Sequence, residues 1–153
     1  HRMAAGLTVA RDRLEEAMAR LADLLGRQGA GAAGPRDLRL DGLLMPGAAT
    51  PALIEEIERA GPFGQGAPAP RFAFADMAIT HTRRIGETHL KFAFSDGMSA
   101  PVEAIAFGAF DTSLGALLEG HGGMRLHLAG RLENNHWQGR TKPQLRLEDA
   151  ARA

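Results

Sequence analysis

Apolar residues recur every three or four positions from about residue 10 to residue 28, and charged residues fill many of the positions between them. The apolar positions are Leu14, Ala17, Met18, Leu21, Leu24 and Leu25. A stripe of this spacing predicts an amphipathic helix with one face for burial. Ahead of it, residues 7–9 predict a short strand. After it, the glycine-rich run 29–35 has too little side chain to build structure and predicts a linker.

Residues 36–61 are expected to hold a short strand and a second helix. Leucine alternates with charged residues at 38–40, which predicts the strand. Thr50-Pro51 predicts the helix start, because threonine is a good N-cap and proline fits the first helical position. The Gly- and Pro-rich run 61–70 is then expected to form a corner through which neither a helix nor a β-ladder can continue. Phe63 is expected to anchor that corner against a core.

After Pro70 apolar and polar residues alternate, which is typical of half-buried strands. The expected strands are 72–79, Thr88–Ser95, Val102–Phe107, Met124–Ala129, and a fifth marked by Trp137, Leu145 and Leu147. A register change predicts a bulge near Asp76. One helix, Phe110–Glu119, separates the third strand from the fourth. This order predicts an α+β chain, mainly β, built on a five-stranded Greek-key barrel of the OB type.

The competing layout is an open antiparallel sheet with one helix on it. We prefer the barrel, because strands this apolar would leave an open sheet with one uncovered face and two exposed edges. The chain is then divided into residues 1–33, a helical unit with its linker, and residues 36–150, in which the barrel occupies 70–148. Its first residue is His1 and not methionine, so we expect a piece cut from a longer chain.

The total charge is balanced, with 18 Lys and Arg residues against 18 Asp and Glu residues. No global field therefore favours nucleic acid, a membrane or an acidic partner. The sequence has no cysteine, which excludes disulfides and thiolate metal sites. No apolar run approaches the roughly 20 residues of a membrane span, and the first residues lack a signal-peptide pattern. We expect a cytoplasmic protein with no membrane partner.

One hairpin is locally basic even though the chain is neutral. The predicted fourth and fifth strands carry five Lys or Arg residues and a single acidic residue between positions 125 and 146. Alternation is expected to turn Arg125, His127 and Arg131 outward together. His89 and Lys91 are expected to point outward from the second strand, which lines the binding face of OB barrels.

Single-stranded nucleic acid needs cations near its phosphates and flat rings beside its bases, and this surface offers both. The candidate binding residues are His89, Lys91, Arg125, His127, Arg131, Trp137, Arg140 and Lys142. The alternative is a solvated basic face without a ligand, in which Trp137 caps the barrel.

The sequence shows no catalytic constellation. Its six histidines are scattered, and no carboxylate stands at metal-ligand spacing. The serines lack His and Asp residues at positions that would suggest a catalytic triad. The glycines around His121 follow a helix and precede a strand, which is the reverse of a phosphate-binding loop. We expect no catalytic residue, metal ion or cofactor in this chain.

Six short motifs are distributed along nearly the whole chain: His1–Gly6, Pro62–Pro70, His89–Lys91, Ala104–Phe107, Asn135–Gly139 and Gln144–Leu147. In this order they resemble segments of RecJ-type single-stranded-DNA exonucleases. The first is similar to the end of the Gly-Gly-His-x-x-Ala-Ala-Gly motif of the DHH-associated domain. The second is similar to a Pro-Phe-Gly-x-Gly-Asn-Pro-x-Pro segment, from which Ala67 departs. The resemblance makes residues 1–33 the end of a truncated α/β DHH-associated domain and residues 36–150 an OB domain.

The resemblance implies a parent enzyme that hydrolyses single-stranded DNA from the 5′ end in DNA repair and recombination. Its Mn²⁺ or Mg²⁺ would be held by a DHH domain that this chain lacks. By the same resemblance His1 lies beside the active site and contacts the substrate backbone. The OB domain then grips single-stranded DNA without reading its sequence. The alternative is an interdomain strut, or an interaction module that docks a partner such as single-strand-binding protein.

Overall fold

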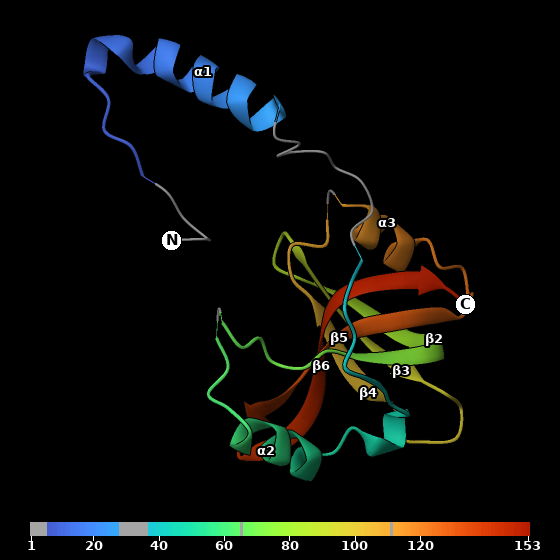
Figure 1. The fold of residues 1–153 in the computed structure, drawn as a ribbon. Coiled ribbons are helices and arrows are strands. Elements are labelled where there is room, and N and C mark those ends of the chain that lie inside the picture. Colours follow the sequence, from blue (N-terminus) through green and yellow to red (C-terminus); the bar gives the residue numbers. More distant parts are fainter. Residues whose placement is uncertain (1–5, 28–36, 65, 111) are drawn as a thin grey trace. The chain divides into compact units, whose positions relative to one another are not determined.

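The computed structural model describes residues 6–27, 37–64, 66–110 and 112–153. The chain splits into two compact units, His1–Leu38 and Arg39–Ala153 (Figure 1). The first contains a 3₁₀ turn, η1 (Arg11–Arg13), and the helix α1 (Leu14–Arg27). The second contains β1 (Gly42–Leu43), η2 (Pro46–Ala48), α2 (Pro51–Arg59), β2 (Phe72–Ile85), β3 (His89–Ser95), β4 (Val102–Ala106), α3 (Ser113–Glu119), β5 (Leu126–Trp137) and β6 (Arg140–Arg152).

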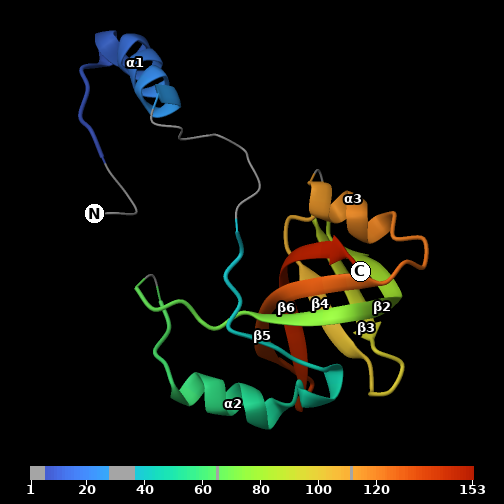
Figure 2. The same cartoon turned by 45° about the vertical axis from the view of Figure 1, so that its right-hand side comes forward.

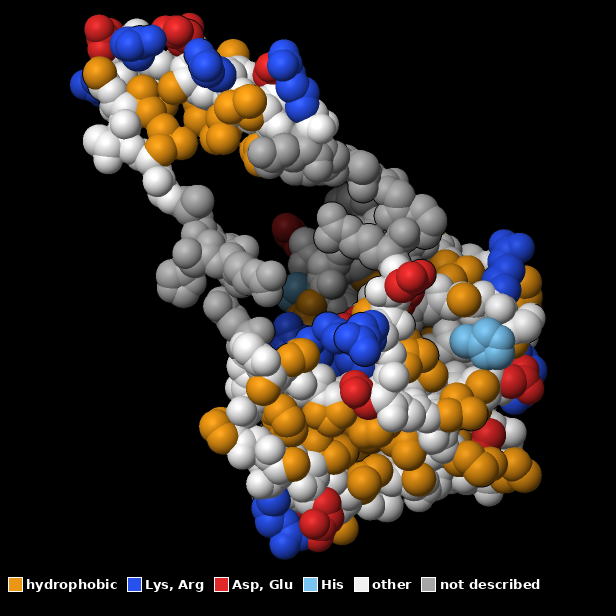
Figure 3. All heavy atoms as spheres, viewed as in Figure 1, with side chains coloured by type: hydrophobic (Ala, Val, Ile, Leu, Met, Phe, Trp, Pro, Cys, Tyr) orange, Lys and Arg blue, Asp and Glu red, His pale blue; other side chains and the backbone are white. Residues whose placement is uncertain are grey.

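In the first unit the predicted amphipathic helix is confirmed. Figure 3 shows charged side chains along one side of α1 and apolar side chains along the opposite side. The expected strand at residues 7–9 is wrong, since these residues form neither a strand nor a helix. A strand needs a partner to satisfy its backbone, and three residues before a helix supply none within this unit. His1 lies outside the described residues.

The second unit is a closed five-stranded barrel, which confirms the predicted OB-type architecture. The strands are paired in the order β2, β3, β4, β6 and β5, and a further pairing between β5 and β2 closes the ring (Figure 2). The pairing of β4 with β6 is parallel and the other four are antiparallel. The two-residue β1 adds a short parallel edge to β2. Closure removes the exposed sheet edges that argued against an open sheet.

The predicted bulge in the first barrel strand is confirmed at Asp76. The β2–β5 register shifts between Phe74 and Met77, and Asp76 has a φ of 59°. Aspartate is one of the few residues with a side chain that tolerate this left-handed conformation. A second register shift follows between Ile79 and His81, and β2 continues beyond the expected residue 79 to Ile85.

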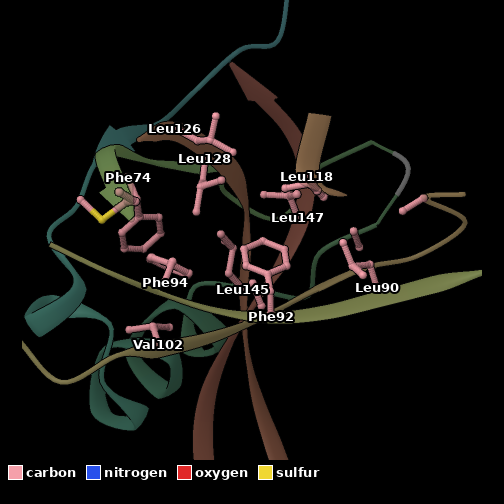
Figure 4. Packing of buried hydrophobic residues seen from close by; sticks show 14 of the residues in the cluster. Phe74, Leu90, Phe92, Phe94, Val102, Leu118, Leu126, Leu128, Leu145 and Leu147 are labelled. Carbon is pink, nitrogen blue, oxygen red and sulfur yellow. The ribbon is translucent and has the colours of Figure 1, made fainter. Parts of the chain in front are cut away.

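The barrel core is filled by the inward residues of all five strands. Phe74 and Phe94 meet edge to face, with ring centroids 5.0 Å apart. Leucines of β5 and β6 and Leu118 of α3 complete the packing, and their side chains converge in Figure 4. The fully buried large residues are Phe74, Phe94, Ile54, Leu90, Leu118, Leu126, Leu128 and Leu145. Burial of each contributes about 1.5–3 kcal/mol before chain entropy is counted.

The two helices of this unit lie at opposite ends of the barrel (Figures 1 and 2). The predicted cap of α2 is confirmed, since Thr50 Oγ1 accepts a hydrogen bond from Leu53 N at 3.2 Å. The other helix, α3, begins at Ser113 and not at Phe110 as expected. Its N-cap is Thr112, whose Oγ1 accepts from Gly115 N at 3.1 Å, and a capping residue precedes the first helical turn.

Three smaller expectations are wrong. Residues 38–40 form no strand, and the pairing with β2 is limited to Gly42 and Leu43. Trp137 ends β5 and does not mark the following strand, because the turn comes directly after it. Phe63 is 37% exposed, so it does not anchor the corner in a core. Each error concerned a residue or short segment whose environment depends on neighbours that are distant in the sequence.

Candidate nucleic-acid interface

A groove of about 830 Å³ opens between the β2–β3 hairpin and the β5–β6 hairpin. Its floor comes from β3, β4 and β6, and its two sides come from the ends of the hairpins. The lining residues are Arg83, Ile85, Lys91, Glu103, Ile105, Asn135, Trp137, Gln138, Arg140, Lys142 and Gln144. In OB barrels this face and the loops beside it are where oligonucleotides and oligosaccharides bind.

Strand register explains why these side chains share one groove. Lys91 of β3 is paired with Arg83 of β2 on one side and with Ile105 of β4 on the other. Paired residues of neighbouring strands point to the same face of a sheet. On the opposite side of the groove, Trp137 is paired with Arg140 across a two-residue turn.

That turn fixes where Trp137 stands. Gln138 and Gly139 both have positive φ, 48° and 74°. Two residues of positive φ match the twist of a tight hairpin, and glycine takes this conformation without strain. Trp137 is held at the tip of the hairpin with 71% of its surface exposed, so it does not cap the barrel.

The groove carries more positive than negative charge. Its one carboxylate, Glu103, forms an ion pair with Lys91, whose Nζ lies 2.7 Å from Oε2. Arg83, Arg140 and Lys142 form no ion pair with any carboxylate in the described part of the chain. These three cations are therefore available to an anionic ligand.

Like charges also stand directly opposite each other on neighbouring strands at two places. Arg83 is paired with Lys91, and Arg131 is paired with Arg146. Such pairs are destabilising when nothing lies between them. In each pair one cation already meets a carboxylate, Lys91 with Glu103 and Arg131 with Glu148. The other cation, Arg83 or Arg146, meets none among the described residues.

Arg125 and His127, which were predicted as binding residues, lie outside the groove and hold the bulge of β2. Arg125 Nε donates to Asp76 Oδ1 at 2.7 Å, and its Nη2 donates to the Asp76 carbonyl oxygen. Asp76 N donates to His127 Nδ1 at 3.1 Å. Three contacts thus support the one residue of β2 that has left-handed backbone geometry.

Arg131 is also engaged within the barrel. Its Nε lies 2.8 Å from Oε1 of Glu148, and Arg71 Nε lies 2.5 Å from the other carboxylate oxygen. The Arg131 Nε makes no well-aligned hydrogen bond, so charge attraction holds this contact. Glu148 is the extra residue of a bulge in β6, because the register passes from Asp149 to Leu147 between consecutive β5 residues.

Of the eight predicted binding residues the structure thus gathers four, Lys91, Trp137, Arg140 and Lys142, in the groove. It does not bring Arg125, His127 or Arg131 to them. His89 lies beside the groove, where its Nδ1 accepts from Gly108 N at 3.1 Å and its ring contacts Phe107.

Sequence reasoning missed several groove residues, chiefly Arg83, Glu103 and Asn135. Arg83 was missed because the first barrel strand was ended too early. The β-branched residues Thr80, Thr82 and Ile85 ahead of Gly86 are the signal that could have extended it. Glu103 faces outward by alternation, but no pattern in the sequence shows that it meets Lys91.

Among the described residues no three His, Cys, Asp or Glu side chains gather in a group that could hold a metal ion. Among the same residues no helix is both long enough and apolar enough to cross a membrane.

Comparisons with known proteins match this chain to one family. The model of the RecJ OB domain matches residues 40–149. The single-stranded-DNA-specific exonuclease RecJ of Dickeya dadantii is 32% identical over 150 residues, which are 97% of this chain and 25% of that protein. The RecJ of Bacillus subtilis is 32% identical over 101 residues, 64% of this chain and 12% of that protein.

A solved structure supports the same assignment of fold. The crystal structure of RecJ from Thermus thermophilus in complex with Mn²⁺ superposes with a TM-score of 0.60 at 24% identity, over 95% of this chain and 20% of that one. The chain spans a quarter or less of the length of these relatives. Since the family model covers most of the barrel unit and the strand order agrees with it, the chain belongs to the RecJ OB domain family.

Proposed function

We propose that this chain is the single-stranded-DNA-binding C-terminal region of a RecJ-like exonuclease that degrades DNA from the 5′ end in repair and recombination. The observation that carries the proposal is the groove, where three cations without described ion-pair partners face an exposed tryptophan. Cations held along a channel attract phosphates, and a flat ring stacks on any base. The groove would grip a strand without selecting its sequence.

In this proposal the catalytic chemistry belongs to the rest of the parent protein. Mn²⁺ or Mg²⁺ would be bound by its DHH domain, and the DNA backbone would pass His1 on the way to that site. The relatives named above are single-stranded-DNA-specific exonucleases, and this chain corresponds to only part of each. Its own role is to hold the strand.

A salt titration of binding tests the proposal. The affinity of this chain for an oligothymidine labelled with a fluorophore is measured at several salt concentrations, and the same sequence as a duplex serves as the control. Release of counterions should make the logarithm of the affinity fall with a slope of about −0.7 for each phosphate contact, hence about −2 for three groove cations. The duplex should bind more weakly, since its bases cannot stack on Trp137. A flat response to salt, or equal binding of the duplex, would contradict the proposal.

One observation favours a second candidate function, docking of a protein such as single-strand-binding protein. Leu40, Leu43 and Met45 are exposed apolar residues within six positions of each other, away from the groove lining. Exposed apolar patches mark surfaces that contact another protein. Capture of purified single-strand-binding protein that is lost in Leu43→Asp and kept in Arg140→Gln would support this function.

A further inference from the structure

A cluster of three side chains continues the groove along its floor. The ring of His89 lies edge-on to that of Phe107, with centroids 5.0 Å apart and an interplanar angle of 75°. The guanidinium carbon of Arg146 lies 5.0 Å from the Phe107 centroid. Phe107 nevertheless keeps 47% of its surface exposed. None of these three residues lines the groove itself.

The cluster adjoins the groove floor at β3, at the end of β4 and at β6. His89 precedes Lys91 by two residues on β3, and Phe107 follows Ile105 by two residues, directly after the last residue of β4, Ala106. Arg146 of β6 is paired with Ile105. Residues two apart on a strand share a face and lie about 7 Å from each other. The cluster and the groove floor are thus parts of one continuous surface.

The opposite end of that surface is Trp137. Trp137 is paired with Arg140, and Arg146 lies six residues further along β6. Six residues of strand span about 20 Å. Lys142 and Gln144 lie between them on the same face, so a line of polar and cationic residues joins the two exposed aromatic rings.

Arg146 has the properties of a ligand-binding cation. Arg146 is exposed, and it forms no ion pair with a carboxylate of the described residues. On the neighbouring strand β5 it is paired with Arg131. The single carboxylate at that position, Glu148, contacts Arg131 and Arg71. The cation–π contact with Phe107 favours this position of Arg146, and the like charge of Arg131 opposite it opposes it, so an anion beside Arg146 would remove the unfavourable part.

We propose that Phe107 and Arg146 form a second base-stacking platform, so that single-stranded DNA lies along β6 from Trp137 to Phe107. This inference rests on the proposed function and adds the path of the strand. One base stacks on Trp137 and a later base stacks on Phe107. The phosphates between them pass Arg140, Lys142 and Arg146. His89 orients the Phe107 ring, because Gly108 N fixes the imidazole from the other side.

Oligonucleotides of two lengths distinguish binding at the Trp137 platform alone from binding at both platforms. We compare oligothymidines of about 4 and about 16 nucleotides, the two ends of the range that one OB fold covers. Phe107→Leu, which keeps the apolar bulk and removes the flat ring, should lower the affinity for the long oligonucleotide by about five- to a hundredfold. It should leave the affinity for the short one unchanged, because Arg140 and Lys142 place the short one at the Trp137 end. Phe107→Trp should retain the wild-type affinity for both.

A variant that removes the charge of Arg146 tests its role in binding. Arg146→Gln should weaken binding of the long oligonucleotide and reduce the steepness of its salt dependence by about 0.7, the share of one phosphate contact. Arg84→Gln is the matched control, since the Arg84 guanidinium also lies over a phenylalanine, Phe110, at 3.9 Å, but not along β6. Arg84→Gln should leave both affinities unchanged.

The outcomes distinguish this inference from the function on which it rests. If the wild-type chain binds neither oligonucleotide, both fail. If the wild-type chain binds the long oligonucleotide and Phe107→Leu binds it equally well, the second platform is refuted while the groove stands. Circular dichroism melting of each variant identifies loss of fold, and Phe107→Trp and Arg146→Gln give readings that do not depend on the stability of Phe107→Leu.

Discussion

Two groups of cations on the β5–β6 hairpin, or directly before it, have different surroundings. Arg125 and Arg131 are each held by a carboxylate, Asp76 and Glu148. Arg140 and Lys142 line the groove and meet no carboxylate of the described residues. All of them point outward by strand alternation, so the side of the strand does not distinguish them. What distinguishes the two groups is the carboxylate partner, which comes from a distant part of the sequence.

The two carboxylates that hold Arg125 and Arg131 each lie at a β-bulge. Asp76 is the left-handed residue of the β2 bulge, and Glu148 is the extra residue of the β6 bulge. A bulge interrupts the ladder and bends the strand. Gly130 allows β6 to come close there, since a Cβ at this residue would lie 2.1 Å from the Arg146 carbonyl oxygen. Arg125 and Arg131 hold the bends that shape the barrel, and Arg140 and Lys142 lie near the hairpin turn beside the groove.

The largest expected effect comes from removing Arg140 and Lys142, the two unpaired groove cations of this hairpin. Arg140→Gln combined with Lys142→Gln should lower the affinity for single-stranded DNA by about tenfold or more near physiological salt and reduce the salt slope by about 1.4, twice the 0.7 of one contact. Fluorescence anisotropy at several salt concentrations measures both. The unfolding midpoint should stay near that of the wild type, because neither side chain has a described partner to lose.

The paired cations are the matched control for that experiment. Arg125→Gln combined with Arg131→Gln removes the same charge from the same hairpin. It should lower the unfolding midpoint and leave the salt slope unchanged, because these cations lie outside the groove and their charges are already neutralised by Asp76 and Glu148. If this double variant loses the salt slope instead, the division of the hairpin into two groups is wrong.

A second test removes one of the holding carboxylates. Glu148→Gln leaves both Arg71 and Arg131 without a counter-charge, with Arg146 directly opposite Arg131. The side chains of this cluster are partly buried, so the free energy of unfolding should fall by about 2 kcal/mol, less than for a fully buried pair. Urea denaturation gives this value.

The control for that test is Glu119→Gln. Glu119 pairs with Arg84 at 2.7 Å, but both side chains are largely exposed. An exposed ion pair contributes about 0–1 kcal/mol. If Glu148→Gln costs no more stability than Glu119→Gln, the bulge in β6 does not depend on its ion pairs.

The sequence predicts most of this fold because its signals are local. Alternation at Phe92 and Phe94 defines a strand whatever surrounds it, and Thr50-Pro51 begins a helix by its own backbone chemistry. The register change at Asp76 likewise shows a bulge directly. The errors fell on segments whose structure depends on a distant partner. Residues 38–40 are an example, since only the next few residues reach β2.

The candidate site was less predictable than the fold, because the ion pairs of its cations depend on residues distant in the sequence. Trp137, Arg140 and Lys142 were found because basic residues and a tryptophan lie close together in the sequence of one locally basic hairpin. Arg125 was given the same role, and its contact with Asp76 spans 49 positions of sequence. Pairing of this kind depends on the closed barrel, which brings β2 next to β5. Residue type and alternation identify candidate cations, and only the three-dimensional fold shows which of them are free.

A third test concerns the one groove cation that is paired. Glu103→Gln frees Lys91 and removes the only carboxylate of the groove. The affinity for single-stranded DNA should rise by about three- to tenfold, and the salt slope should steepen by about 0.7 if Lys91 then meets a phosphate. Glu133→Gln is the control, because Glu133 is also on β5–β6 but does not line the groove. An equal rise in both variants would indicate a general charge effect and not release of Lys91.

The smallest effect concerns a carboxylate that is held by the backbone and not by a cation. The amides of Ser99 and Met98 donate to Asp96 Oδ1 at 2.8 Å and hold the pKa of this carboxyl below its ordinary value of 3.8. A lowered pKa means that the ionised form is the more stable one in the fold. Its contribution is therefore complete above the ordinary pKa and is lost as the pH falls through the lowered one.

Asp96→Asn keeps the acceptor oxygen and cannot ionise, so it isolates this contribution. Between about pH 5 and pH 2 the wild type should lose slightly more stability than Asp96→Asn, because only the wild type has this carboxylate to protonate. Melting curves across that range measure the difference, which should be the least of the four because Asp96 lies at the surface. Parallel loss in both proteins would mean that the amide contacts in the β3–β4 loop do not favour the charged form. Backbone amides would then contribute less to holding carboxylates in this barrel than the arginines at its bulges do.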